Sequence, residues 1–121
     1  MIFCFAGSST DLTAYAKKLK QALKLPGDCP ILPPPLDFLQ NLESLDDRAF
    51  GAALQNYLEA LPEPLILLGR EMGNGLVPLS PEARRFRERN GLFLQAAAAR
   101  AERVDYVLAG LGICLKYENK G

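Results

Sequence analysis

Histidine is absent from this chain of 121 residues. Its absence excludes a histidine base, a histidine nucleophile and the commonest protein ligand of zinc. Fourteen basic residues balance fourteen acidic ones, so no overall charge favours nucleic acid or an anionic membrane. No apolar run approaches the roughly 20 residues that a membrane-spanning helix needs. We therefore expect neither a nucleic-acid nor a membrane partner.

Cysteine is scarce, with Cys4, Cys29 and Cys114 as the only three. An odd count without paired spacing argues against a disulfide framework and for the reducing cytoplasm. Cys4 and Cys114 stand in apolar, strand-like runs, where we expect small buried side chains. The first residues have a short apolar run without a basic flank, which predicts a first strand rather than a signal peptide.

Strand and helix patterns alternate along the chain and predict one α/β domain over residues 1–121. Apolar runs predict strands at 2–6, 65–68, 104–109 and 113–117, and residues 29–32 suit a short strand. Helical spacing predicts helices at 12–25, 47–61 and 81–103, with N-caps at Asp46-Asp47 and at Ser80 before Pro81, whereas residues 36–45 are ambiguous. This order predicts a mostly parallel sheet, with a turn at residues 110–112 leading into an antiparallel C-terminal edge hairpin.

The most distinctive motif follows the strand at residues 65–68. It reads Gly69-Arg70-Glu71-Met72-Gly73-Asn74-Gly75-Leu76-Val77-Pro78, and then Ala83-Arg84-Arg85-Phe86-Arg87-Glu88. It resembles the Thr/Ser-Asn-Glu-Val-Gly-x-Gly-Ile-Val-Pro and Ala-Arg-x-Phe-Arg-Asp segments of the adenosylcobinamide kinase/adenosylcobinamide-phosphate guanylyltransferase family. The family's Gly-x-x-Asn-Gln falls on Gly91 to Gln95, and its closing strands fall on Val104, Gly110 and Lys116. The likeness runs from residue 67 to residue 116 without a gap.

The resemblance implies a reduced form of the three-layer fold of P-loop NTPases. Residues 1–25 then form a degenerate phosphate-loop βα unit, and residues 65–117 form the family's C-terminal half. In the family's phosphate-loop register, Asp11 replaces a glycine and Leu12 replaces the lysine. A phosphate loop needs that lysine to reach the β- and γ-phosphates. Only Thr13 keeps a hydroxyl where the family places its magnesium ligand.

The middle of the chain also departs from the family. The family is longer there and carries the histidine that takes up guanylate, whereas this chain has a shorter middle and no histidine. The family's covalent guanylyl route is therefore not available to it. We expect the scaffold to be kept and both catalytic signatures to be lost.

Several residues are candidates for a site, each with a plainer alternative. Glu71 is the one candidate catalytic residue, and the alternative is a solvated loop acid. Gly73 and Gly75 allow close approach of a ligand, or serve a loop that needs positive φ. Gly7 and Ser8, at a helix start, could bind an anion, but Asp11 opposes one.

The arginine-rich helix supplies the remaining candidates. Arg84 and Arg87 lie three residues apart on one helical face and would clamp phosphate, or else belong to a solvated face paired with glutamates. For Arg85 and Arg89 we expect the solvated face. Gln95 would contact a nucleotide or partner, or make a buried bond between helices.

These observations support two main hypotheses about function. The first is a cobalamin-biosynthesis protein without kinase or guanylyltransferase activity, which binds a nucleotide or a corrinoid, or assembles with another subunit. The alternative is a divergent but active adenosylcobinamide kinase, which would use GTP or ATP with Mg²⁺. A third possibility is a self-associating domain, as homo-oligomer or as subunit of a related protein, because the family forms oligomers.

Overall fold

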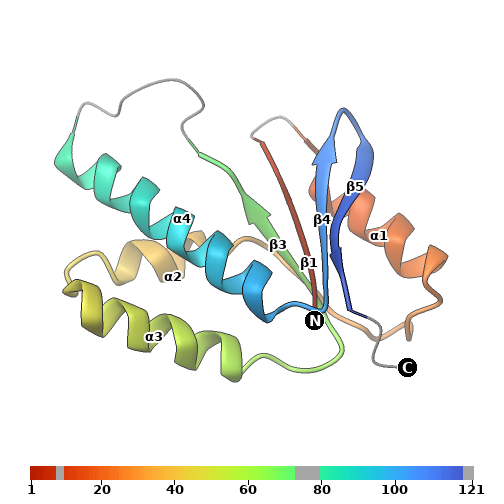
Figure 1. Cartoon of the computed structure of the whole chain (residues 1–121), viewed down its shortest axis with the longest axis horizontal. Coiled ribbons are helices and arrows are strands. Elements are labelled where there is room, and N and C mark those ends of the chain that lie inside the picture. The colour runs from red at the N-terminus through yellow and green to blue at the C-terminus, as the bar shows by residue number, and fades with distance from the viewer. Residues whose placement is uncertain (8–9, 73–79, 119–121) are drawn as a thin grey trace.

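The strands form one sheet in the order β2–β3–β1–β4–β5, with helices on both faces (Figure 1). The computed structural model describes residues 1–7, 10–72 and 80–118. The strands are β1 (Ile2–Ala6), β2 (Ile31–Leu32), β3 (Ile66–Arg70), β4 (Arg103–Leu108) and β5 (Leu111–Tyr117). The helices are α1 (Leu12–Ala22), α2 (Leu36–Asn41), α3 (Asp47–Glu59) and α4 (Pro81–Arg100).

The sheet is parallel except at one edge. Strand β1 lies at the centre and pairs in parallel with β3 on one side and β4 on the other. Strand β2 extends the parallel part, and β5 runs antiparallel to β4. The expectation of an α/β, P-loop-NTPase-like three-layer fold with a C-terminal edge hairpin is therefore confirmed. No helix in the described part of the chain is long and apolar enough to cross a membrane.

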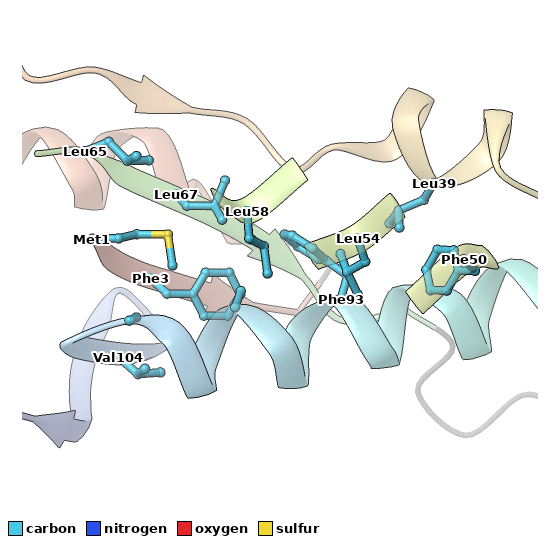
Figure 2. Packing of buried hydrophobic residues seen from close by; sticks show 12 residues of the cluster. Met1, Phe3, Leu39, Phe50, Leu54, Leu58, Leu65, Leu67, Phe93 and Val104 are labelled. Carbon is cyan, nitrogen blue, oxygen red and sulfur yellow. The ribbon is translucent and has the colours of Figure 1, made fainter. Parts of the chain in front are cut away.

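Each face of the sheet has its own core. Helix α1 covers one face, where Leu12, Ala16 and Leu19 pack against side chains of β1, β3 and β4. Helices α2, α3 and α4 cover the other face, where Phe3 and Leu67 of the sheet meet Phe93 of α4 (Figure 2). This alternation follows from the strand period of two, since neighbouring residues of β1 and β3 point to opposite faces.

The predicted helix starts are confirmed, but the three predicted helix ends are wrong, since α1 ends at Ala22 rather than at residue 25 and α3 ends at Glu59 rather than at residue 61. Asp46 and Ser80 are N-caps whose side chains accept hydrogen bonds from the N–H groups of Ala49 and Ala83. Helix α4 ends at Arg100 rather than at residue 103. The backbone is already extended at Ala101, and the N–H of Glu102 donates to the carbonyl of Met1, so the chain has joined the sheet there.

Two expectations about the C-terminal hairpin also need correction. The turn is formed by Ala109 and Gly110, which have φ of 53° and 78°, and Leu111 and Gly112 already belong to β5. Cys114 is exposed rather than buried, because β5 is an edge strand whose residues are nearly all exposed. Cys4 in the central strand is fully buried as expected.

Candidate functional site

The carboxyl ends of β1, β3 and β4 meet at one edge of the sheet, away from the N-terminus in Figure 1. In open α/β sheets this edge is where ligands bind. A cleft of about 680 Å³ opens there between α1 and the end of β4. Its lining includes Gly7, Thr10, Asp11, Tyr15, Lys18 and residues 106–110. Residues between β1 and α1, residues of α1 and residues of the C-terminal hairpin therefore line the same cleft.

At the start of α1, the two residues that the resemblance aligns with the phosphate loop have structural contacts. Leu12 is 1% exposed and packs in the core between α1 and the sheet, so it offers nothing to a ligand. Asp11 is the N-cap of α1, and its carboxylate accepts a hydrogen bond of 3.0 Å from the N–H of Ala14. The carboxylate therefore takes one of the free N–H groups that a phosphate would need.

Arg70 reaches into the N-terminal loop from the end of β3. Its Nη1 donates to the carbonyl oxygen of Gly7 at 2.6 Å and to that of Thr10 at 2.9 Å. The carbonyl of Arg70 accepts a hydrogen bond of 2.7 Å from the buried Asn90 amide of α4. Sequence reasoning noted Arg70 in the motif but gave it no role, because its partners are 60 and 63 residues away.

Glu71 extends the same strand end on the opposite face. Its N–H donates to the carbonyl of Ala6 at 2.8 Å, which fixes its backbone beside β1. The hydroxyl of Tyr106 donates to the Glu71 carboxylate at 3.2 Å, and the negative charge of Glu71 is the main cause of a raised Tyr106 pKa. The Tyr106 ring contacts Phe5, with 5.0 Å between ring centroids. The half-buried Glu71 carboxylate therefore has a hydrogen-bond partner at the carboxyl end of β3.

Of the two described candidates near the N-terminus, Thr13 is less favourably placed for binding than Gly7. Thr13 is exposed in the first turn of α1 and does not line the cleft, although Gly7 does. Among the described residues no group of three His, Cys, Asp or Glu side chains gathers as a metal site. Ser8, Gly73 and Gly75 lie outside the described residues.

The arginine-rich helix divides into exposed and buried positions. Arg84 and Arg87 are exposed, and Arg87 lines a second cleft of about 670 Å³ with Leu36, Met72 and Phe86. Gln95 is exposed on α4, so the buried alternative for it is wrong. None of these three side chains lines the cleft beside α1.

The expectation of a solvated face is wrong for Arg89. This side chain is buried, lies 4.2 Å over the Phe50 ring and donates to the carbonyl of Leu45 at 2.8 Å. Arg85 is exposed as expected, but it donates to the carbonyl of Glu43. Both arginines therefore connect α4 to the segment that joins α2 and α3.

Lys116, which matches the end of the family motif, has a structural contact. Its Nζ donates to the carbonyls of Ala98 and Ala99, at 3.1 Å and 3.0 Å, in the last turn of α4. A cation there stabilises the helix end, where carbonyls lack partners within the helix. Lys116 thus links β5 to the C-terminal end of α4 by hydrogen bonds.

A buried polar group that sequence reasoning missed lies under the cleft. Asp105 is 1% exposed in β4, accepts a 2.6 Å hydrogen bond from Tyr15 and forms an ion pair with Arg103. Burial raises the pKa of the neighbouring Cys4 thiol to about 12, and the charge of Asp105 adds to the shift. Burial and the Asp105 hydrogen bond also raise the pKa of Tyr15. The sequence signal that could have revealed this group is the position of Asp105, a carboxylate within an otherwise apolar strand.

Comparison with known proteins identifies a family that matches this sequence. The sequence model of the cobinamide kinase / cobinamide phosphate guanyltransferase family matches residues 37–115, which is more than half of the chain. The bifunctional adenosylcobalamin biosynthesis protein CobP of Pseudomonas aeruginosa is 42% identical over 85 residues, covering 67% of this chain and 49% of that protein. The bifunctional adenosylcobalamin biosynthesis protein CobU of Escherichia coli is 36% identical over 73 residues, covering 58% of this chain and 40% of that protein.

The chain spans about half the length of the curated relatives that it matches. The family match begins at residue 37, so Gly7, Asp11 and Leu12 lie before it. Glu71, Arg84, Arg87 and Gln95 lie within it.

Proposed function

Because the chain belongs to the cobinamide kinase / cobinamide phosphate guanyltransferase family, we propose that it is a cobalamin-biosynthesis protein that performs neither of the family's transfer reactions. In this proposal the chain binds a nucleotide or a corrinoid, or assembles with another subunit, in the cytoplasm. Its partner is a second copy or a related protein.

One observation carries this proposal. In the register that the resemblance gives, Leu12 stands at the position of the phosphate-loop lysine, and its side chain is 1% exposed in the core between α1 and the sheet. A leucine cannot neutralise a triphosphate, and the adjacent carboxylate of Asp11 repels one. The chain also lacks any histidine to accept guanylate. Both transfer reactions therefore lack the groups that the resemblance assigns to them.

The binding part of the proposal is supported by the cleft beside α1. It lies at the carboxyl ends of the strands, where Tyr15 supplies aromatic surface and Lys18 supplies a cation. Glu71 adds a carboxylate at the same sheet edge, held by Tyr106. The Glu71 carboxylate suits a ligand with hydrogen-bond donors. Binding of such a ligand would not require a triphosphate.

Calorimetry of the full chain with GTP, ATP and adenosylcobinamide, each with and without Mg²⁺, tests the proposal. We expect any heat of binding to be independent of Mg²⁺, because no phosphate-loop lysine is present to hold a magnesium–triphosphate complex. Magnesium-dependent GTP binding at micromolar affinity would overturn the proposal and favour the divergent active kinase.

A further inference from the structure

We propose that the β4–β5 hairpin is the surface on which a second copy of this chain docks, with the two copies paired strand to strand along β5. Two features of the hairpin carry this inference, an exposed apolar patch and an open strand edge beside it. The inference rests on the proposed function for the idea that this chain assembles, and it adds the surface and the partner.

Large apolar side chains gather on the hairpin without being buried. Among the described residues, five of the eight exposed large hydrophobic side chains belong to β4 and β5, namely Leu108, Leu111, Ile113, Leu115 and Tyr117. Leu111 is 72% exposed and Tyr117 is 66% exposed, the two highest values of the eight. Monomeric soluble proteins rarely expose large contiguous apolar patches, and such patches mark surfaces that bind another molecule.

The register of the hairpin joins part of this group into one patch. Leu111 lies opposite Leu108, and Ile113 lies opposite Tyr106. Residues two apart in a strand share a face, so these four side chains lie on the same face of the hairpin. The Tyr106 ring contacts Phe5, which packs against the core under α4. The patch therefore continues that core to the edge of the sheet, where the tip of the hairpin stands apart from α4 (Figure 1).

The backbone beside this patch is also open. Strand β5 is the last strand of the sheet, and among the described strands it pairs only with β4. Edge strands are usually protected from further pairing by proline, by outward charges, by bulges or by being short. Residues 111–117 contain no proline, and their one charged side chain, Lys116, binds carbonyls at the end of α4. The register shift lies between Cys114 and Lys116, so residues 111–114 form a regular, unprotected edge.

The composition of this edge favours a second copy over a charged partner. Antiparallel pairing of two β5 strands about a two-fold axis at Gly112 uses only the regular residues, and it places Leu111 of each copy opposite Ile113 of the other. Cross-strand apolar pairs of this kind stabilise antiparallel sheets. Residues 111–114 carry no charge, and basic and acidic residues balance over the chain, so net charge does not keep two copies apart. The same patch therefore supplies both halves of the interface.

The size of the surface sets the expected affinity. Stable interfaces bury about 800 Å² per partner, which is more than four apolar side chains and a short strand edge supply. We therefore expect a reversible dimer with a dissociation constant of about 10 µM. Sedimentation velocity of the full chain between about 1 and 300 µM measures it. A chain that stays monomeric over this range, or that forms species larger than a dimer, would overturn the two-fold pairing.

One variant and its matched control connect the dimer to the hairpin. Ile113 and Leu92 are both 46% exposed, but Leu92 lies on α4. We expect Ile113→Glu to raise the dissociation constant at least about tenfold, because pairing would place the charge beside Leu111 of the second copy. Leu92→Glu should leave it within about twofold of the wild-type value. Equal effects of the two variants would show that the dimer does not form through the hairpin.

A second variant keeps the test sound if a glutamate loosens the strand itself. The double variant Leu111→Thr/Ile113→Thr retains residues with high strand propensity and removes the apolar pairs. We expect it to weaken the dimer at least about tenfold while its circular dichroism spectrum stays that of wild type. Undiminished dimerisation of this folded variant would contradict the role of the patch.

Hydrogen exchange tests whether the strand edges pair. At about 300 µM, we expect the amides of residues 111–114 that do not bond to β4 to exchange at least about tenfold more slowly than at about 1 µM. The amides of β2, at the opposite edge of the sheet, should exchange at the same rate at both concentrations. Exchange in β5 that is independent of concentration would overturn the strand pairing.

The interface and the proposed function fail on different results. Magnesium-dependent GTP binding contradicts the proposed loss of transfer chemistry and leaves the β5 interface intact. A chain that stays monomeric contradicts the interface and leaves the proposed loss of transfer chemistry intact.

Discussion

Gly69 in β3 lies so close to neighbouring side chains that the position has no room for a Cβ atom. A Cβ atom there would lie 2.6 Å from Cζ of Phe3 and 2.7 Å from Cδ2 of Leu94. We expect Gly69→Ala to lower the free energy of unfolding by about 1–3 kcal/mol, because the core must shift to admit a methyl group. Gly51→Ala in α3 is the control, since nothing lies within 4 Å of its Cβ. That change should stabilise by about 0.5–1 kcal/mol.

Urea unfolding of the two variants measures both effects. A Gly69→Ala protein as stable as wild type would contradict the packing of β3 against Phe3 and Leu94.

Cys4 makes stability depend on alkaline pH. Its pKa is about 12 in the folded protein and 9.0 without the fold. Between these values the unfolded chain loses the thiol proton while the folded chain keeps it, so stability falls as pH rises. The slope is about 1.4 kcal/mol per pH unit for one such group. The raised pKa of Tyr15 acts in the same direction above pH 10.0.

We expect Cys4→Ala to flatten this decline in urea-unfolding experiments above about pH 9. Cys114→Ala is the matched control, because that thiol is exposed and its removal should leave the slope as in wild type. An identical slope in Cys4→Ala and wild type would show that the buried thiol does not cause the decline.

At the level of single residues, the sequence was informative where a residue's own chemistry mattered. Leu12 and Asp11 led to the proposal of a lost phosphate loop, because neither a leucine nor an aspartate can neutralise a triphosphate. Arg70 was not predictable, because its role depends on loop carbonyls 60 and 63 residues away. Asp105 was missed for a similar reason, since Tyr15 lies 90 residues away.

Among the elements, α4 depends on Arg89 for its contact with the segment between α2 and α3. We expect Arg89→Ala to lower the free energy of unfolding by about 2–3 kcal/mol, through the lost contact with Phe50 and an unsatisfied Leu45 carbonyl. Arg85→Ala, which removes an exposed side chain with one bond to Glu43, should cost about 0.5 kcal/mol. Thermal unfolding of the Arg89→Ala and Arg85→Ala variants compares the two effects. Equal losses of stability would contradict a structural role for the buried Arg89 side chain.

The helix starts were predictable, whereas one helix face and the helix ends were not. Ser80 and Asp46 cap their helices through their own side chains, so local sequence suffices. The end of α4 is set by the bond between Glu102 and Met1, which local sequence does not show. Arg89 looks like a surface residue in sequence, and only the position of α3 makes it buried.

For the whole molecule, the order of apolar runs was enough to predict a mostly parallel α/β sheet with an antiparallel edge hairpin, whereas the three-layer fold of P-loop NTPases was implied by the family resemblance. Strands that alternate with helices form parallel sheets with right-handed crossovers, so few arrangements remained. The placement of the candidate site at the carboxyl ends of the strands follows from that architecture. The cleft itself was not predictable, because it depends on how α1 and the β4–β5 hairpin approach each other.

The proposed loss of transfer chemistry is tested most directly by incubating the full chain with adenosylcobinamide, Mg²⁺ and ATP or GTP labelled at the γ-phosphate. We expect no more label on the corrinoid than in a sample without protein, because the buried Leu12 offers no cation to a triphosphate at the start of α1. Label transfer that requires both the protein and Mg²⁺, and that falls when Glu71 is changed to Gln, would contradict the proposed function.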